Sequence, residues 1–144
     1  MTESQKLVAV DLDDTLIKNI QHGTWTPRSG AIETLIKLHG EYNFCIITSR
    51  SPELKDQTLE VVKNIESKVG FAFEGVYFTR EKVSKAVELG CVALVDDDQE
   101  YLIGCIGIIY GILFGTEEKD LKCCQFRARD WNEVDAILTF LLPE

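Results

Sequence analysis

Acidic residues and a threonine stand directly after an apolar run near the start of the chain. Residues 6–10 (KLVAV) are typical of a buried strand, and Asp11, Asp13, Asp14 and Thr15 follow at once. Open α/β sheets bind ligands at the carboxyl ends of their strands, so we expect these acids to line a crevice. At about 4 Å and an effective dielectric near 20, each pair of like charges costs ~4 kcal/mol. A divalent cation would convert this repulsion into binding, and hard oxygen ligands suit Mg²⁺. The alternative is a polar turn that caps the next helix.

A second apolar run ends in the same way. Residues 42–47 (YNFCII) predict a buried strand that leads directly into Thr48, Ser49 and Arg50. Hydroxyl groups at such a strand end are suited to an anion, although Thr48 can instead cap the following turn. Arg50 is open to two interpretations, a grip on a substrate phosphate or sugar and an ion pair at the surface.

A third cluster completes the pattern. Residues 91–95 (CVALV) predict a strand that ends in a run of aspartates beginning with Asp96 and Asp97. A helix expected after the preceding strand carries Lys82 near its start and Lys85 one turn later, and we prefer Lys82 because it is nearer the strand end. Since the carboxyl ends of parallel strands meet at one edge of a sheet, these groups are predicted to converge there.

The remaining sequence predicts how these residues are held. Strands are expected at residues 6–10, 42–47, 71–78, 91–95 and 108–114. Helices are expected from Pro27 to Gly40, over residues 51–69, 83–89, 99–105 and 134–142. Ile36 in the first and Leu54 in the second are among the residues expected on the buried helix faces. Residues 17–27 are interpreted as an irregular segment or small hairpin, and residues 125–131 as a short edge strand. Strands alternating with helices predict an α/β fold of the three-layer α/β/α, Rossmann-like kind, with a mainly parallel sheet of roughly five strands.

Composition narrows the functional classes. The chain has 144 residues, which suits a single domain over 1–144, and its net charge of −9 argues against nucleic acid or an anionic membrane as a partner. The first residues lack the basic and apolar regions of a signal peptide, so we expect a cytoplasmic protein. Three of the five cysteines, Cys45, Cys91 and Cys105, lie in apolar runs, while Cys123 and Cys124 are interpreted as ordinary thiols.

The order of these motifs resembles the haloacid dehalogenase (HAD) superfamily of phosphohydrolases. Its first motif, an apolar strand followed by Asp-x-Asp-x-Thr, is matched by Asp11, Asp13 and Thr15. Its second is a strand ending in Thr or Ser, its third a lysine near a helix start, and its fourth a strand ending in paired acids. These are matched by Thr48, Lys82 and Asp96-Asp97. The layout is most similar to small, nucleotidase-like members.

The resemblance implies a Mg²⁺-dependent phosphatase that cleaves a phosphate monoester, with a nucleotide as one candidate substrate. It implies that Asp11 is the nucleophile and forms an aspartyl-phosphate, and that Asp13 protonates the leaving oxygen and then activates water. The phosphate-binding residues that it implies are Thr48, Ser49 and Lys82. The implied metal ligands are Asp11, Asp13 through its backbone carbonyl, Asp97 directly and Asp96 through water.

Many relatives carry an inserted cap domain, for which this chain has no room between its motifs. We therefore expect a capless protein whose crevice is open to solvent, and whose substrate is either large or enclosed with the help of a second copy of the chain. Phosphotransfer to an acceptor other than water stays open. The alternative from another functional class is a catalytically weak phosphate-binding or regulatory module that keeps the fold.

Overall fold

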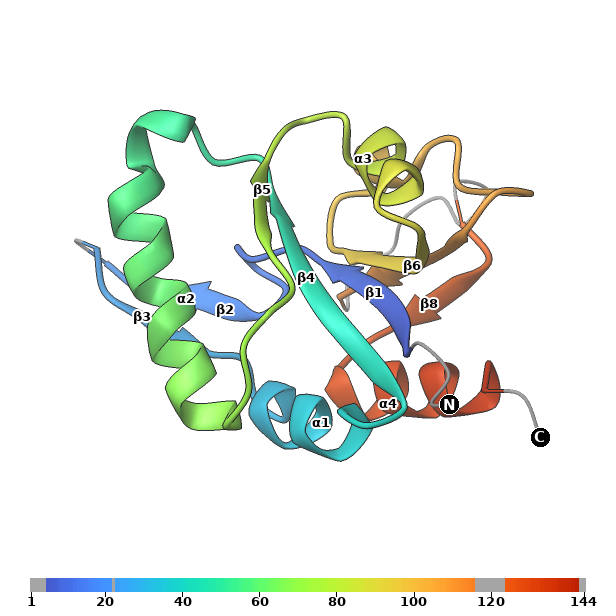
Figure 1. Ribbon diagram of the computed structural model, residues 1–144, viewed down its shortest axis with the longest axis horizontal. Coiled ribbons are helices and arrows are strands. Elements are labelled where there is room, and N and C mark those ends of the chain that lie inside the picture. The colour runs from blue at the N-terminus through green and yellow to red at the C-terminus, as the bar shows by residue number, and fades with distance from the viewer. Residues whose placement is uncertain (1–4, 22, 116–123, 143–144) are drawn as a thin grey trace.

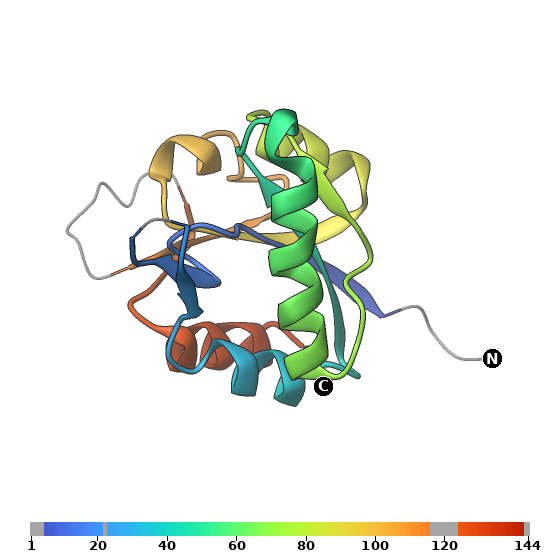
Figure 2. The ribbon, with the colours of Figure 1, turned by 90° about the vertical axis from the view of Figure 1, so that its left-hand side faces the viewer.

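The computed structural model describes residues 5–21, 23–115 and 124–142, which form a sheet covered by helices on both faces (Figures 1 and 2). The sheet has six strands in the order β5-β4-β1-β6-β7-β8, and every neighbouring pair is parallel. These strands are β1 (Lys6–Val10), β4 (Tyr42–Thr48), β5 (Val76–Phe78), β6 (Cys91–Asp96), β7 (Tyr110–Phe114) and β8 (Phe126–Ala128). A separate antiparallel hairpin pairs β2 (Ile17–Asn19) with β3 (Trp25–Pro27).

Helices connect the strands and form the two outer layers. They are α1 (Ala31–Leu38), the 3₁₀ helix η1 (Pro52–Leu54), α2 (Lys55–Val69), α3 (Lys82–Glu88), the 3₁₀ helix η2 (Gln99–Leu102) and α4 (Trp131–Phe140). α1 packs against α2 and α4, whereas α3 packs against β6 and η2. The sheet therefore lies between α1, α2 and α4 on one face and α3 and η2 on the other.

Alternation along the central strands divides the core into two apolar clusters. In β1, Val8 and Val10 belong to the cluster that packs against α1, α2 and α4, and Ala9 belongs to the cluster that packs against α3 and η2. β4 alternates in the same way, with Phe44 and Ile46 on one face and Cys45 and Ile47 on the other. Burial on both faces explains why these strands are almost continuously apolar in sequence. The three-layer α/β fold predicted from the sequence is confirmed.

Several boundaries differ from the sequence prediction. α1 begins at Ala31 rather than at Pro27, because Pro27 is the last residue of β3 and lies opposite Ile17. The third strand is confined to Val76–Phe78, and the expected helix at residues 99–105 is a 3₁₀ helix of four residues. The last helix begins at Trp131, and the side chain of Asp130 accepts a hydrogen bond from the Glu133 amide at its start.

The strand count and two of the expected core positions also differ. The sheet has six strands rather than five because the short segment expected at the edge forms β8, which pairs in parallel with β7. Ile36 is 49% exposed and Leu54 is 44% exposed, so neither contributes to the buried helix faces to which the sequence assigned them. Residues 17–27 are expected to be an irregular segment or a small hairpin, and the structure shows the hairpin.

The connections between the motif-bearing strands are short. β1 and β4 are joined by the hairpin and α1, and β4 and β5 are joined by η1 and α2. The part of the chain that the structure describes therefore includes no separate cap domain. Within that same part, no helix has both the length and the apolar character that crossing a bilayer requires.

Candidate active site

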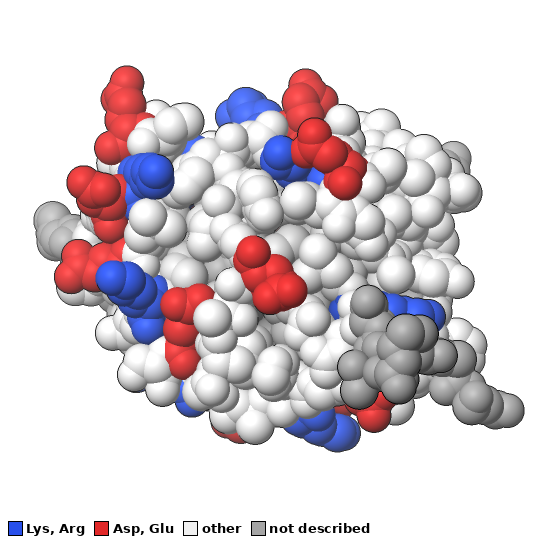
Figure 3. Space-filling view, in the orientation of Figure 1, with Lys and Arg blue, Asp and Glu red and all other residues white. Residues whose placement is uncertain are grey.

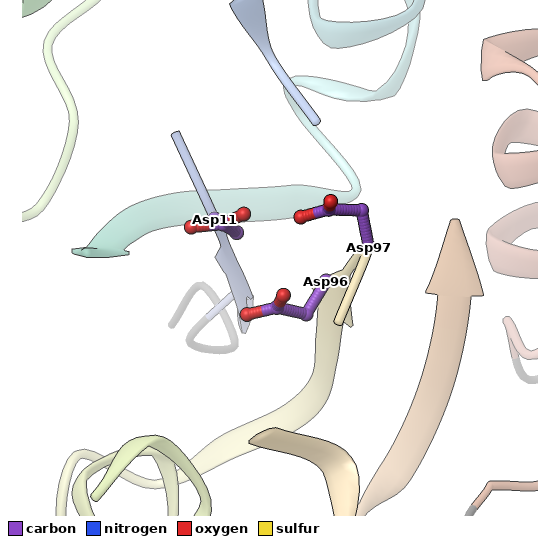
Figure 4. A group of neighbouring side chains, drawn as sticks. All are labelled: Asp11, Asp96 and Asp97. Carbon is purple, nitrogen blue, oxygen red and sulfur yellow. The ribbon is translucent and has the colours of Figure 1, made fainter. Parts of the chain in front are cut away.

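Three carboxyl groups converge at the carboxyl edge of the sheet (Figure 4). Asp11 follows β1, Asp96 ends β6, and Asp97 comes next in the chain. Each offers one oxygen atom such that the three oxygens lie within 4.8 Å of one another. β1 and β6 are paired in parallel with Val10 opposite Val95, and the Asp11 amide donates to the Val95 carbonyl at 2.9 Å. The register of these two strands therefore fixes the meeting of the carboxylates.

A buried lysine joins two of these acids. Lys82, the first residue of α3, is 1% exposed, and its Nζ atom donates to Asp11 Oδ1 and to Asp96 Oδ2, both at 2.8 Å. The ammonium also lies 4.4 Å from the centre of the Tyr101 ring, a cation–π distance. Lys85, one turn later on the same helix, forms an ion pair with Glu88, with 2.6 Å between Lys85 Nζ and Glu88 Oε2.

Burial and mutual repulsion shift the protonation of these groups. The pKa of Asp11 is raised well above its usual value, first because the carboxyl is buried and then because Asp96 is nearby. Burial raises the pKa of Asp96 to about 6, although Lys82 and the Asp98 amide oppose the shift. Burial lowers the pKa of Lys82, but its two carboxylate partners outweigh that effect and the pKa is raised overall. The single positive charge of Lys82 therefore does not balance the negative charges of Asp11 and Asp96.

The donor set fits a divalent cation. Asp11, Asp96 and Asp97 supply only carboxylate oxygens, the ligand type that Mg²⁺ takes in proteins. Lys82 brings one positive charge to the two carboxylates that it contacts, Asp11 and Asp96, so these two carry surplus negative charge when both are ionised. A bound Mg²⁺ ion would neutralise them and would supply charge stabilisation to a phosphoryl group at this edge.

The turn after β1 holds the acids in place. The amides of Leu16 and Ile17 both donate to the Leu12 carbonyl, at 3.0 and 3.1 Å, so the chain reverses tightly after the strand. The hydroxyl of Thr15 donates to Asp11 Oδ2 at 3.1 Å. The indole Nε1 of the buried residue Trp131 donates to the Thr15 carbonyl at 2.8 Å, which ties the turn to the start of α4.

Asp13 lies apart from the three converging acids and is held by an arginine. Arg50 donates from Nε to Asp13 Oδ2 and from Nη2 to Asp13 Oδ1, both at 2.8 Å, in a bidentate pair. Asn19 of the hairpin donates to the same carboxyl group at 2.8 Å. Burial would raise the pKa of Asp13, but the hydrogen bonds from Arg50 and Asn19 outweigh burial and lower it. The side chain of Asp13 is therefore not part of the acid cluster, and a metal contact through its carbonyl stays a prediction.

The end of β4 places two hydroxyl residues beside this edge. β4 is paired in parallel with β1, with Ile46 opposite Val10, so Thr48 reaches the level of the turn that follows Asp11. Thr48 is buried, and its hydroxyl accepts a hydrogen bond from the Arg50 amide at 3.1 Å, which is the turn-capping contact expected as the alternative. Ser49 follows it and is half-buried. Phosphate binding by these two residues stays a prediction.

Three contacts of this site could not be predicted from the sequence. Tyr101 faces Lys82 from η2, Asn19 reaches Asp13 from the hairpin, and the Thr58 hydroxyl accepts from Arg50 Nη1 at 3.2 Å. Each joins segments that approach only in the folded chain. Among the cysteines, Cys45, Cys91 and Cys105 are buried as expected, and the interpretation of Cys123 lies outside the described residues.

Charged side chains of both signs lie on the surface. On the face drawn in Figure 3, Lys and Arg side chains alternate with Asp and Glu over α2 and α3. The described residues form no continuous basic patch on that face.

Comparison with solved structures places this fold in a known class. No protein-family model and no curated protein sequence matches the chain. A haloacid dehalogenase-like hydrolase from Xanthomonas campestris matches at 13% identity and a TM-score of 0.66, over 97% of each chain. D,D-heptose 1,7-bisphosphate phosphatase from Burkholderia thailandensis matches at 14% identity and a TM-score of 0.65, over 94% of this chain and 99% of that protein. A HAD-superfamily hydrolase from Geobacter sulfurreducens matches at 11% identity and a TM-score of 0.64, over 93% of this chain and 100% of that protein.

The chain therefore has the fold of the HAD superfamily, and the resemblance drawn from its motifs is confirmed at the level of the fold. The motif residues Asp11, Lys82, Asp96 and Asp97 meet at the carboxyl edge of that fold.

Proposed function

We propose that this protein is a Mg²⁺-dependent phosphohydrolase that cleaves phosphate monoesters. The observation that carries the proposal is the convergence of Asp11, Asp96 and Asp97 around Lys82. The fold neighbours support it, since two are described as hydrolases and one as a phosphatase. A nucleotide is one candidate substrate, and a cytoplasmic location and self-association stay predictions.

Asp11 is the proposed nucleophile. Its carboxylate oxygen attacks phosphorus, the bond from phosphorus to the leaving oxygen breaks, and an aspartyl-phosphate forms on Asp11. Attack of one anion on another requires positive charge at the reacting atoms. Lys82, at 2.8 Å from Asp11, supplies part of it. A cation held by Asp11, Asp96 and Asp97 would supply the rest, with Asp97 as the proposed direct ligand and Asp96 as a ligand through water.

Asp13 is the proposed proton-transfer residue, and Thr48 and Ser49 are the proposed contacts of the phosphoryl oxygens. Asp13 gives a proton to the leaving oxygen and then takes one from the water that hydrolyses the aspartyl-phosphate. Arg50 keeps Asp13 ionised in the free protein, which suits the second step. The first step then requires that the pKa of Asp13 rise when an anionic substrate arrives beside it.

The state of Asp13 also favours a second candidate function. A carboxyl group whose two oxygens are both occupied by Arg50 and whose pKa is lowered is a poor general acid. A catalytically weak module that binds phosphate through Lys82 and Thr48 would show this same geometry.

Hydrolysis of 4-nitrophenyl phosphate with Mg²⁺ separates the two functions. We expect turnover by the native chain and its loss in Asp11→Asn, while Asp56→Asn, which changes an exposed aspartate on α2, keeps the native rate. Trapping with acid should give phosphorylated native protein and none of the Asp11→Asn variant. Equal rates for native and Asp11→Asn protein, or no turnover of any ester, would favour the binding module.

A further inference from the structure

A cavity of about 660 Å³ opens beside Asp13, between the β2–β3 hairpin and α2. In Figure 2 the hairpin, in blue, lies next to the green helix. The volume is in the range of about 300–1,000 Å³ that small-molecule sites occupy. Ten residues line it, among them Asp13, Asn19, Trp25 and Arg50.

One face of α2 forms a wall of the cavity. Gln57, Glu60, Val61 and Asn64 are spaced by three and four residues, so they lie in one stripe along the helix. Val61 is buried at the base of this stripe, and the other three side chains are exposed and polar. The helix therefore turns a row of hydrogen-bonding groups toward the hairpin.

The charges in the cavity disfavour an anionic occupant. Arg50 is the one cationic residue among the ten that line it. Its Nε and Nη2 atoms donate to Asp13, and its Nη1 atom donates to Thr58. Glu60 adds a negative charge on the α2 side. A second phosphate or a carboxylate on the substrate would meet Glu60 without an available cation.

The uncharged groups suit a polar ring. Asn19, Gln57 and Asn64 each carry an amide that can both donate and accept, and the carboxylate of Glu60 accepts from hydroxyls. Trp25, half-buried on β3, offers an aromatic surface on which a sugar or a base can stack.

We propose that this cavity holds the leaving group of the substrate, and that this group is an uncharged ring bearing hydroxyl or amide groups, such as a sugar or a nucleoside. The inference rests on the proposed function, because a leaving group has to lie against Asp13, the proton-transfer residue, and Asp13 forms one edge of the cavity. The substrates are then monophosphates of neutral rings rather than bisphosphates.

Steady-state hydrolysis by the full chain with Mg²⁺ tests this assignment. The substrates are glucose monophosphate, adenosine monophosphate, fructose bisphosphate and acetyl phosphate, whose small leaving group does not fill the cavity. We expect kcat/KM for at least one of the two neutral-ring monophosphates to exceed that for the bisphosphate about tenfold or more. In Asn64→Ala, the ratio of that monophosphate's kcat/KM to that of acetyl phosphate should fall about tenfold, as the loss of one hydrogen bond allows. Asn132→Ala, which removes an exposed amide from α4, is the matched control and should keep the native ratio.

A charge reversal gives the complementary test. Glu60→Lys places a cation in the cavity and should raise kcat/KM for fructose bisphosphate relative to the monophosphates by about tenfold. Glu41→Lys makes the same change at an exposed position outside the cavity and should leave the preference as it is. A native preference for the bisphosphate, or equal ratios in Asn64→Ala and Asn132→Ala, would overturn the assignment while acetyl phosphate turnover still supports the phosphatase.

A binding measurement distinguishes failure of the proposed phosphatase function from failure of the neutral-ring assignment. If not even acetyl phosphate is hydrolysed, the proposed function fails, and the cavity is judged from calorimetric titration with glucose and with adenosine. Binding of either by the native chain that Trp25→Ala abolishes would support a neutral-ring site. Absence of binding, or equal binding by Trp25→Ala, would contradict it.

Discussion

Replacing Lys82 by methionine removes the cation that two buried acids share and keeps most of the side-chain volume. At 2.8 Å and an effective dielectric near 20, each contact of Nζ with Asp11 or Asp96 has a gross Coulomb energy of ~6 kcal/mol. Desolvation of the buried charges cancels much of this. Removing one partner of a buried ion pair costs about 3–5 kcal/mol, and this is the loss that we expect for Lys82→Met in metal-free buffer at neutral pH.

Urea unfolding with EDTA measures this loss, and Lys85→Met is the control. Lys85 is on the same helix but pairs with the exposed residue Glu88, so its replacement should cost about 0–1 kcal/mol. The loss in Lys82→Met should shrink near pH 5, because the carboxyl of Asp96 then takes up a proton. The pKa of Asp96 is about 6 with Lys82 present, and it rises further without it.

A second substitution tests the cause of the instability. Adding Asp11→Asn to Lys82→Met removes one of the uncompensated charges and should recover part of the lost free energy of unfolding. If Lys82→Met costs no more than Lys85→Met at neutral pH, the ammonium is not the group that holds Asp11 and Asp96, and the electrostatic account of the site is wrong.

Three further predictions follow from the same charges. In EDTA, the free energy of unfolding of the native chain should fall as pH rises from about 4 to 7. Since the pKa of Asp96 is raised to about 6 in the native state, that state binds more protons than the unfolded state in this range, and the contribution is ~3 kcal/mol. When the free energy of unfolding is measured with urea at several pH values, Asp11→Asn should reduce its slope against pH. Mg²⁺ at about 100 times its dissociation constant should raise stability by ~2.7 kcal/mol, and a thermal shift assay should show that Asp97→Asn reduces this gain. Arg50→Gln removes the hydrogen bonds that lower the pKa of Asp13, so the pH above which kcat/KM for an alkyl phosphate declines should move upward, and Lys18→Gln should not move it.

The sheet and the meeting of its acids could be predicted because both depend on short-range patterns. The runs at β1, β4 and β6 are almost continuously apolar, which marks strands covered on both faces. Parallel pairing then brings their carboxyl ends to one edge without further information. The convergence of Asp11, Asp96 and Asp97 thus follows from where the apolar runs stop.

The contacts of Asp13 could not be predicted in this way. Its bidentate partner Arg50 is 37 residues away, and the pair forms only because the turn after β1 and the turn after β4 face one another. The sequence left two interpretations of Arg50, a substrate contact and an ion pair at the surface. The structure shows a part-buried ion pair with Asp13, and a contact with substrate stays a prediction. Likewise, Ile36 and Leu54 match the apolar spacing of their helices, but that spacing does not specify how far around each helix the neighbouring layer reaches.

The same charge imbalance links the stability of this site to its chemistry. Asparagine in place of Asp11 would relieve the repulsion with Asp96 and would leave Lys82 with a single charged partner, so the native arrangement is not the most stable one for the folded chain alone. A site of this kind gains stability when a cation binds beside the carboxylates. The surplus of buried negative charge beside one ammonium therefore supports the proposed metal site.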